Sequence, residues 1–362
     1  MPIGLAIIGA GYWGPNLVRT ALATPAFRLD WLCDLRLERA RSVLGPYTTV
    51  RATNSYETIL ADPGVAAIAI ATPAATHFDL VRSALEAGKH VMVEKPLTPS
   101  AAEGEKLAAL AQRYELVLMC DHTYCYTPAV KRIRELIRGG EIGELQFVDS
   151  VRINLGLVQP DVDVLWDLAP HDLSILDFVL PGDIHPVAVA AHASDPIGAQ
   201  RACVAYLSVW LSNGALAHIH VNWLSPTKIR TTVFGGSRRT VVWDDTNPAG
   251  RLAVHDRGVD TRDAASVPQD ERRQALIAYR TGDTLIPALP EREALMSVMA
   301  EFSEAIAESR PPLTDAAAGV RVLRLLEAAS RSAETGGTRL ALDGDILDGD
   351  VSGGDILGGD LV

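Results

Sequence analysis

The sequence predicts an α/β protein with two domains of different construction. An apolar run at residues 3–8 leads directly into a glycine-rich loop, and strand-like and helix-like segments then alternate to about residue 120. Such alternation is typical of a parallel sheet covered on both faces. From residue 123 several strand-like runs follow one another, which predicts an α+β domain with a large, mostly antiparallel open sheet. We expect a domain at 1–122, a second at 123–342 and an acidic Gly/Asp-rich tail at 343–362.

The glycine-rich loop has the pattern G-x-G-x-x-G at Gly9, Gly11 and Gly14, between a β-branched strand and an amphipathic segment. The first glycine permits a tight turn, the second lets the backbone approach a pyrophosphate, and the third lets helix and strand pack closely. The helix N-terminus offers free N–H groups to the phosphates. This context predicts a Rossmann dinucleotide-binding domain.

An acid follows the second strand-like run, where a dinucleotide fold needs one. Asp34 lies 20 residues after Gly14, close to the spacing of a carboxylate that accepts from the adenosine ribose hydroxyls. A carboxylate repels a 2′-phosphate, so NAD is favoured over NADP. Arg36 complicates this preference because a nearby arginine accommodates that phosphate. The alternative for Asp34 is a turn residue that ends a strand.

The N-terminal elements place several polar residues at one edge of the expected sheet. Ligands of parallel sheets bind beyond the carboxyl ends of the strands. The glycine loop, Asp34, Ala71-Thr72-Pro73 and Glu94-Lys95-Pro96 all fall there. The expected strands are 3–8, 28–33, 66–71, 90–93 and 115–120, and the expected helices lie near 15–23, 35–44, 55–61, 77–88 and 99–113.

In the second domain, Asn213-Gly214 between two apolar runs indicates a hairpin. Polar residues 246–290 indicate long loops with short strands, and the tail indicates acidic disorder or, alternatively, a short strand pairing with a neighbouring edge or subunit. The expected helices are 128–138, 168–180, 291–308 and 315–334, and the expected strands are 145–153, 186–193, 202–211, 214–223, 228–234 and 239–243.

Composition restricts the partners and the compartment. The net charge is −12 and there is no basic stretch, which argues against nucleic acid and anionic membranes. No apolar run reaches the ~18 residues of a membrane span. The expected strand at residue 3 leaves no room for a signal peptide, and the four cysteines form no C-x-x-C. We expect a cytoplasmic protein.

A dehydrogenase removes a hydroxyl proton as hydride leaves the same carbon, so it needs a base and a donor to the oxygen. Lys95 ends a buried strand, and Pro96 holds it in an extended conformation with a possible cis bond. Desolvation at the top of the sheet would disfavour its charged form. The alternative is an ordinary lysine facing solvent.

A second candidate pair is Asp167 and His171, four residues apart and therefore on one helical face. Histidine is the natural base near neutral pH, and a carboxylate can orient it. Pro170 should interrupt the helix, so that Asp167 precedes its first full turn. The pair alone also suggests a metal, but no third ligand stands out and we expect none. A helix N-cap at Asp167 is the other alternative.

With these motifs in order, the chain resembles the glucose–fructose oxidoreductase/inositol dehydrogenase family, Gfo/Idh/MocA. The resemblance runs from Pro2 to about Asp343. It rests on GAGYWG at 9–14, Ala71-Thr72-Pro73 with His77, Ala87-Gly88-Lys89-His90 running into Glu94-Lys95-Pro96, the Asp167…His171 pair, and Leu313-Thr314-Asp315. The family implies a second domain whose sheet forms a homodimer or homotetramer interface.

The resemblance also implies roles for individual residues. His171 would accept or donate the proton, Lys95 would bind the reacting oxygen, and Asp167 would position substrate or His171. The implied cofactor-binding residues are Gly9, Gly11, Tyr12, Trp13, Gly14, Asp34, Arg36, Thr72, Pro73, His77, Glu94 and Lys95. The implied substrate-binding residues are Lys95, His122, Arg152, Asn154, Asp167 and His171.

Three functions remain open at this point. The leading one is an NAD-dependent dehydrogenase or ketoreductase acting on a sugar, sugar nucleotide or cyclitol. Redox-assisted elimination or glycoside cleavage with recycled NAD would need a further base, and a non-catalytic NAD-binding regulator would need no proton relay. A sugar nucleotide would demand basic groups over its diphosphate. The candidates are Arg152, Lys228, Arg230 and Arg238, and the alternative for all four is that they are solvated charges at strand ends.

Overall fold

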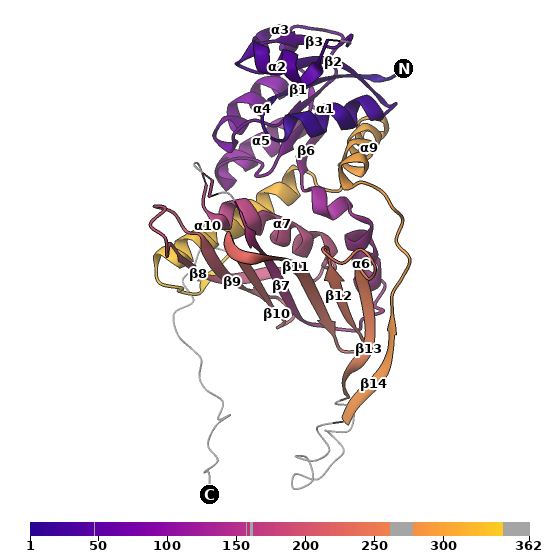
Figure 1. The fold of residues 1–362 in the computed structure, drawn as a ribbon, viewed down its shortest axis with the longest axis vertical. Helices are drawn as coiled ribbons and strands as arrows, with labels where there is room; N and C mark the ends of the chain where they lie inside the picture. The colour runs from indigo at the N-terminus through magenta and orange to yellow at the C-terminus, as the bar shows by residue number, and fades with distance from the viewer. Residues whose placement is uncertain (47, 157, 160–161, 261–277, 343–362) are drawn as a thin grey trace, which may run out of the picture.

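The computed structural model describes residues 1–46, 48–156, 158–159, 162–260 and 278–342. Two sheets form the two halves of the molecule, one above the other in Figure 1. The acidic tail expected at 343–362 lies outside the described residues. Among the residues described, no helix is long and apolar enough to cross a membrane.

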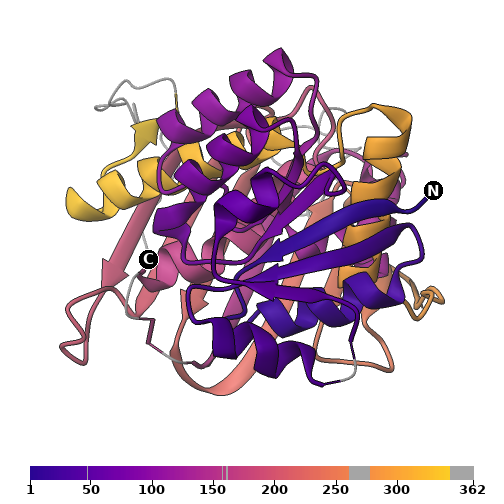
Figure 2. The same ribbon diagram turned by 90° about the horizontal axis from the view of Figure 1, so that it is seen from above.

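The first sheet has six parallel strands in the order β3-β2-β1-β4-β5-β6. Figure 2 shows helices on both of its faces. The expected strands and helices are all present. Strand β3 is an additional strand, and its three residues, Arg-Ala-Thr, are too short a run to predict one. The elements are β1 (Ile3–Ile8), α1 (Gly14–Ala23), β2 (Phe27–Cys33), α2 (Leu37–Leu44), β3 (Arg51–Thr53), α3 (Tyr56–Leu60), β4 (Ala67–Ile70), η1 (Ala74–Thr76), α4 (His77–Glu86), β5 (His90–Glu94), α5 (Ala101–Arg113) and β6 (Leu118–Asp121).

The second sheet has nine strands in the order β14-β13-β12-β11-β7-β10-β9-β8-β15. Only the β7–β10 pair is parallel among the strand pairs of this sheet that the structure describes. The α/β class with a mostly antiparallel second sheet is therefore confirmed. The elements are η2 (Thr123–Tyr126), α6 (Pro128–Arg138), β7 (Leu145–Leu155), α7 (Val164–Val179), β8 (Pro186–Ser194), β9 (Val204–Leu211), β10 (Leu216–Asn222), β11 (Leu224–Gly236), β12 (Thr240–Asp244), β13 (Leu252–Asp260), β14 (Ala278–Leu285), α9 (Ala294–Glu308), α10 (Ala316–Glu334) and β15 (Leu340–Ala341).

The hairpin expected at Asn213-Gly214 joins β9 to β10, and Gly214 has a φ of 87° that suits glycine. The expectation for 246–290 was wrong in part, because β13 and β14 are strands of nine and eight residues that pair at the sheet edge. These strands could not be predicted because their residues are mostly polar and form no long apolar run, as suits strands at a sheet edge that have little surface to bury. Residues 261–277 between them lie outside the described part of the chain.

Helix α7 also corrects an expectation. It begins at Val164, and its N-cap is Asp163, whose carboxylate accepts from the backbone N–H of Trp166 at 3.0 Å. Pro170 lies inside the helix, where it removes one backbone hydrogen bond without ending it. Asp167 is therefore a residue of the first turn, neither ahead of the helix nor its N-cap.

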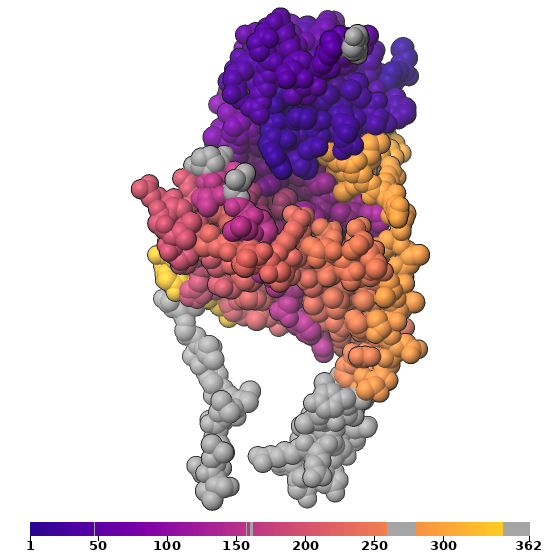
Figure 3. Space-filling view, viewed as in Figure 1, coloured from indigo at the N-terminus to yellow at the C-terminus, as the bar shows by residue number. Residues whose placement is uncertain are grey.

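The C-terminal helices contact both sheets. Thr314, just before α10, accepts from the backbone N–H of Cys120 at 2.9 Å and donates its hydroxyl to the Cys120 carbonyl at 2.7 Å. The ring of Phe302 on α9 packs 5.8 Å from that of Phe27 at the start of β2. Further along α10, the Ser332 hydroxyl accepts from the backbone N–H of Ala191 on β8 at 2.8 Å, so this helix links β6 to the second sheet. Figure 3 shows the hollow between the two halves.

Candidate active site

The glycine loop forms a cradle beside a cavity of about 470 Å³. A side chain at Gly9, where φ is 101°, would clash with the carbonyl of Ala71, and one at Gly14 would clash with the carbonyl of Gly9. At Gly11, by contrast, a Cβ would meet nothing within 4 Å among the described residues. Gly11 therefore opens toward the cavity, and α1 begins directly behind the loop with its free N–H groups.

Asp34 lies at the far side of the same cavity. Its carboxylate accepts from the backbone N–H of Ala10 at 2.9 Å and from that of Arg36 at 2.9 Å, which ties the end of β2 to the glycine loop. Arg36 and Arg39 line this cavity as well. The glycine cradle, the helix N-terminus and the acid at the end of β2 together fit a dinucleotide cofactor.

The Ala71-Thr72-Pro73 segment closes this cavity on another side, and Thr72 and Pro73 line it. His77 is buried and holds two loops together, because its ring nitrogens contact the carbonyls of Pro96 at 2.8 Å and Thr72 at 2.9 Å. Burial lowers its pKa. The structure thus gives His77 a loop-bridging position one layer behind Thr72.

Lys95 is fixed at the carboxyl end of β5, followed by a cis bond to Pro96. Its ammonium donates to the backbone carbonyl of Asp167 at 2.7 Å and to the Asp167 carboxylate at 3.1 Å. The other carboxylate oxygen accepts from the indole N–H of Trp223 at 3.0 Å. An ammonium has three N–H bonds, so two point at Asp167 and one remains for a ligand.

His171 lies one helical turn beyond Asp167. Its ring meets the ring of Tyr124 edge-on, with centroids 4.9 Å apart. Burial lowers the pKa of His171 well below its usual range, and the nearby charges of Lys95 and Arg152 lower it further. His171 is therefore neutral at pH 7 and able to accept a proton.

A second cavity of about 550 Å³ joins these groups to the glycine loop. Lys95, His171, Tyr124 and Arg230 line it, together with Trp13 from the loop, and the exposed Tyr12 stands at its rim. The cleft therefore brings a lysine and a neutral histidine next to the cradle that fits a dinucleotide.

Buried polar atoms without a geometric hydrogen-bond partner among the described residues lie in and behind the cleft wall. Trp13 Nε1, Glu94 Oε1 and His171 Nδ1 belong to residues that line the cleft, whereas Asp121 Oδ2 and both ring nitrogens of His122 belong to buried residues outside its lining. Glu94 and Asp121 are register partners on β5 and β6, and burial followed by the charge of Asp121 raises the pKa of Glu94. A protonated Glu94 can donate to Asp121 and so satisfy this pair, whereas the unpaired ring nitrogen of His171, a residue that lines the cleft, is available to a polar ligand.

Arg152 and Asn154 lie outside the lining of the cleft. Arg152 is buried and donates twice to Asp172, at 2.7 and 3.0 Å, with its guanidinium 4.4 Å from the centroid of the Tyr124 ring. Asn154 lies at the end of β7 against Gly156, outside the cavity lining.

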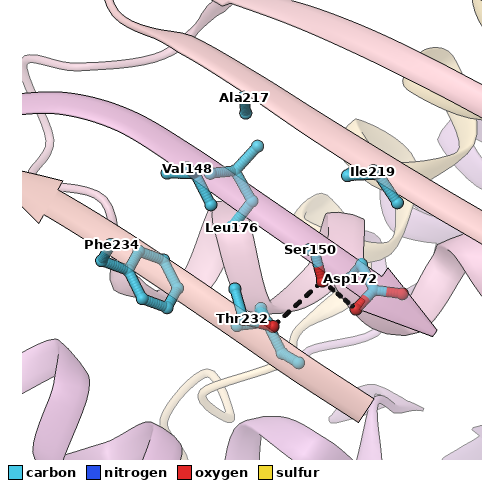
Figure 4. Close-up of a pocket in the computed structure, with 9 residues that line it drawn as sticks. Val148, Ser150, Asp172, Leu176, Ala217, Ile219, Thr232 and Phe234 are labelled. Atoms are coloured by element: carbon cyan, nitrogen blue, oxygen red, sulfur yellow. Dashed lines mark hydrogen bonds between the residues drawn. The ribbon is translucent and has the colours of Figure 1, made fainter. Parts of the chain in front are cut away.

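A buried polar network supports Arg152 from the inner face of the sheet. The Ser150 hydroxyl on β7 donates to the Asp172 carboxylate at 2.9 Å and contacts the Thr232 hydroxyl on β11 at 3.0 Å, as Figure 4 shows. The space they line holds only about 10 Å³, so these groups form a packed support for Tyr124 and His171.

Sequence reasoning missed Tyr124, Arg39 and the cleft position of Arg230. Tyr124 follows the carboxyl end of β6, so the strand-edge rule that singled out Lys95 would also have singled out Tyr124. Arg230 reaches the cleft only through the pairing of β11 with β7, which no local pattern shows. Among the residues described, no group of three or more His, Cys, Asp or Glu could hold a metal ion.

Two protein-family models match this chain. The model of an oxidoreductase family with an NAD-binding Rossmann fold matches residues 3–122, and the GFO/IDH/MocA C-terminal domain matches residues 130–241. The chain belongs to the GFO/IDH/MocA oxidoreductase family. The resemblance noted from the sequence is thereby confirmed.

Several relatives of known name share nearly the whole length of this family member. UDP-N-acetylglucosamine 3-dehydrogenase of Acidithiobacillus ferrooxidans is 29% identical over 328 residues, which cover 88% of this chain and 93% of the relative. Its solved structure matches with a TM-score of 0.78 at 27% identity, over 92% of this chain and 99% of that one. GenD2 of gentamicin A biosynthesis, solved with NAD, matches with a TM-score of 0.76 at 25% identity, over 94% and 96%.

A cyclitol enzyme is also among the relatives. The NADP-dependent scyllo-inositol 2-dehydrogenase IolW of Bacillus subtilis is 24% identical over 321 residues, covering 84% of this chain and 86% of the relative. The relatives thus differ from one another both in substrate and in cofactor.

Proposed function

We propose that the protein is an NAD-dependent dehydrogenase or ketoreductase that acts on a secondary alcohol or ketone of a sugar, sugar nucleotide or cyclitol. The observation that carries the proposal is the cleft in which Lys95, held by Asp167, and His171 lie next to the dinucleotide cradle. When bound, the nicotinamide ring supplies the hydride acceptor or donor.

In the oxidation direction, His171 accepts the proton of the substrate hydroxyl, because its neutral ring is the base in the cleft. Lys95 donates its remaining N–H bond to the same oxygen and stabilises the negative charge that develops there. Asp167 fixes the ammonium by two hydrogen bonds and acts through Lys95. Ketone reduction uses the same groups in reverse.

Asp34 supports a preference for NAD. Its carboxylate lines the cavity that fits a dinucleotide and would repel a 2′-phosphate bound there, whereas Arg36 and Arg39 in the same lining supply charge that would tolerate one. We infer that NAD is bound more tightly and that NADP is also bound.

The test of the function is absorbance at 340 nm with NAD and a panel of sugars, cyclitols and nucleotide sugars. Turnover with a member of the panel supports a dehydrogenase. Tightly bound NAD(H) with no net change on any substrate would contradict net dehydrogenation and favour internal redox recycling or a regulator.

We also propose a homo-oligomer formed through the outer face of the second sheet. Helices α6, α7 and α10 lie on one side of this sheet, as Figure 1 shows. Large exposed side chains lie on neighbouring strands of the other side: Phe147, Tyr206 and Leu216. Phe147→Asp should convert the dimer or tetramer to monomers in light scattering, and an unchanged mass would refute this interface.

A further inference from the structure

We propose that Arg230 makes the cleft selective for an anionic group, so that the substrate is a sugar bearing a phosphate, diphosphate or carboxylate. The inference rests on the proposed function and names its substrate class. It starts from the position of Arg230 on β11, in the wall of the cleft that also holds Lys95 and His171.

The guanidinium of Arg230 is only loosely paired. Its shortest contact with an acid is 3.5 Å, from Nη1 to Asp245, and its Nε is buried with no hydrogen-bond partner in the described part of the chain. The side chain remains 29% exposed, which leaves it open to the cleft. An arginine with a buried, unused donor has capacity for a further acceptor.

The neighbour of Arg230 across the sheet is another arginine. Arg230 stands directly opposite Arg152 in the β11–β7 register, and both guanidiniums approach the Tyr124 ring, with centroid distances of 5.8 and 4.4 Å. Like charges directly opposite one another destabilise a sheet. Asp172 compensates Arg152 with two short hydrogen bonds, whereas Arg230 has no equivalent compensation among the described residues.

The other charged groups in the cleft wall are already engaged. Lys95 is hydrogen-bonded to Asp167 and keeps its third N–H for the reacting oxygen, and Glu293 at the rim is paired with Arg19 of α1. Burial raises the pKa of Glu94, which favours its neutral form. Arg230 is therefore the cation of the described wall that has no hydrogen-bonded acid, and a bound oxyanion would offset the repulsion from Arg152.

The chemistry of guanidinium identifies the ligand. Its planar donors match phosphate and carboxylate oxygens and bind them in pairs. A neutral cyclitol or hexose offers only hydroxyl groups, which would leave the charge of Arg230 uncompensated. The shared requirement is an oxyanion, and the two sources are a sugar phosphate or nucleotide sugar and a sugar acid.

The test is calorimetric titration of the NAD-loaded protein with uridine diphosphate, inorganic phosphate and glucuronate. Arg230→Gln should weaken binding of the preferred anion about 10- to 100-fold, as loss of a charge-assisted hydrogen bond requires. Lys228→Gln is the matched control, because Lys228 is exposed on the same strand and lies outside the cavity lining. Tight uridine diphosphate binding identifies a phosphate source, and tight glucuronate binding identifies a sugar acid.

Equal anion affinity in wild type and Arg230→Gln would overturn the proposal, as would an equal loss in Lys228→Gln. Arg230→Lys provides a second variant if the glutamine variant does not fold: it should retain part of the affinity, and full retention of wild-type affinity would refute bidentate binding. A failure of the proposed function can be distinguished from a failure of the role of Arg230. Turnover of neutral sugars alone would overturn only the role of Arg230, whereas hydride transfer to no substrate would overturn the dehydrogenase itself.

Discussion

The ammonium of Lys95 makes two hydrogen bonds to Asp167, one to its backbone carbonyl at 2.7 Å and one to its carboxylate at 3.1 Å. The two residues are 72 positions apart. Lys95 directly follows β5 of the first sheet, whereas Asp167 lies on α7, which packs on the second sheet. This contact joins the half that contains the Rossmann sheet to the half that contains the second sheet, in the cleft that we propose as the active site. It also gives Asp167 a role distinct from that of a partner for His171.

Replacing Asp167 should therefore impair the placement of Lys95. We expect Asp167→Ala to lower kcat about 10- to 100-fold with little change in NAD affinity, because one charge-assisted hydrogen bond to the ammonium is lost. Steady-state kinetics at 340 nm and cofactor titration measure the two quantities. Trp223→Phe, which removes the indole donor to Asp167 together with part of a buried ring, should show a smaller loss. A kcat unchanged in both variants would contradict this role.

His171→Ala should lower kcat by about 10²–10⁴, as expected when a general base is removed. Cofactor binding should be preserved, since His171 lies outside the cavity that fits the nucleotide. Activity within a few-fold of wild type would mean that another group takes the proton. Because the pKa of His171 is depressed, wild-type kcat/KM for oxidation should stay flat from neutral pH down to well below pH 6.5 as far as this group is concerned.

Asp34→Ala should weaken NAD binding about 10- to 100-fold and improve the relative binding of NADP. The variant removes the carboxylate that repels a 2′-phosphate and keeps Arg36 and Arg39. Fluorescence titration with NADH and NADPH gives both affinities without a substrate. Asp79→Ala on the exposed side of α4 serves as the control, and unchanged NADH affinity in Asp34→Ala would remove Asp34 from the ribose site.

The buried pair of Arg152 and Asp172 should matter for stability. Asp172→Asn leaves Arg152 buried without a counter-charge, which should cost about 3–5 kcal/mol in the free energy of unfolding. Denaturant titration measures the change. Asp183→Asn, at an exposed position in the loop after α7, should change stability by less than about 0.5 kcal/mol. Equal stability of wild type and Asp172→Asn would show that the network in Figure 4 tolerates the loss of charge.

His122 should make the protein less stable in acid. Burial, followed by the charge of Lys95, lowers its pKa to about 4 from 6.5. Between those values the unfolded chain binds a proton that the native protein does not, so stability falls with decreasing pH by about 1.4 kcal/mol per unit. Glu94 contributes with the opposite sign, because its pKa is raised.

The difference in unfolding free energy between wild type and His122→Gln isolates this one histidine. The difference should decline as pH falls from about 6.5 to about 4 and remain constant at higher pH. A difference that is independent of pH over this range would mean that His122 already binds its proton in the native protein.

Local patterns predicted much of this fold because the responsible residues are close in sequence. The strand, the turn at Gly9 and the helix behind Gly14 follow within twelve residues, and each glycine has a local steric reason. Asp167 and His171 are one helical turn apart, so their common face could be predicted even though the helix start could not. Pro170 misled the prediction, since a proline in a helix interior usually ends the helix, whereas here the cap at Asp163 and tertiary packing outweigh it.

Contacts between distant segments could not be predicted in the same way. Arg230 faces Arg152 only because β11 pairs with β7 in one register, and Tyr124 meets His171 only after η2 packs on α7. The engagement of Arg152 with Asp172 likewise depends on the packing of α7 on the sheet. These relationships decide which cations reach the cleft, and they exist only in the folded chain.

The most direct test of the account compares wild type with Lys95→Met in a single turnover with NAD and the substrate found by the panel. We expect reduced cofactor at 340 nm in wild type and, at saturating NAD, a rate at least about 10²-fold lower in Lys95→Met. Equal rates in the two proteins would contradict the assignment of the cleft held by Lys95, Asp167 and His171 as the site of hydride transfer.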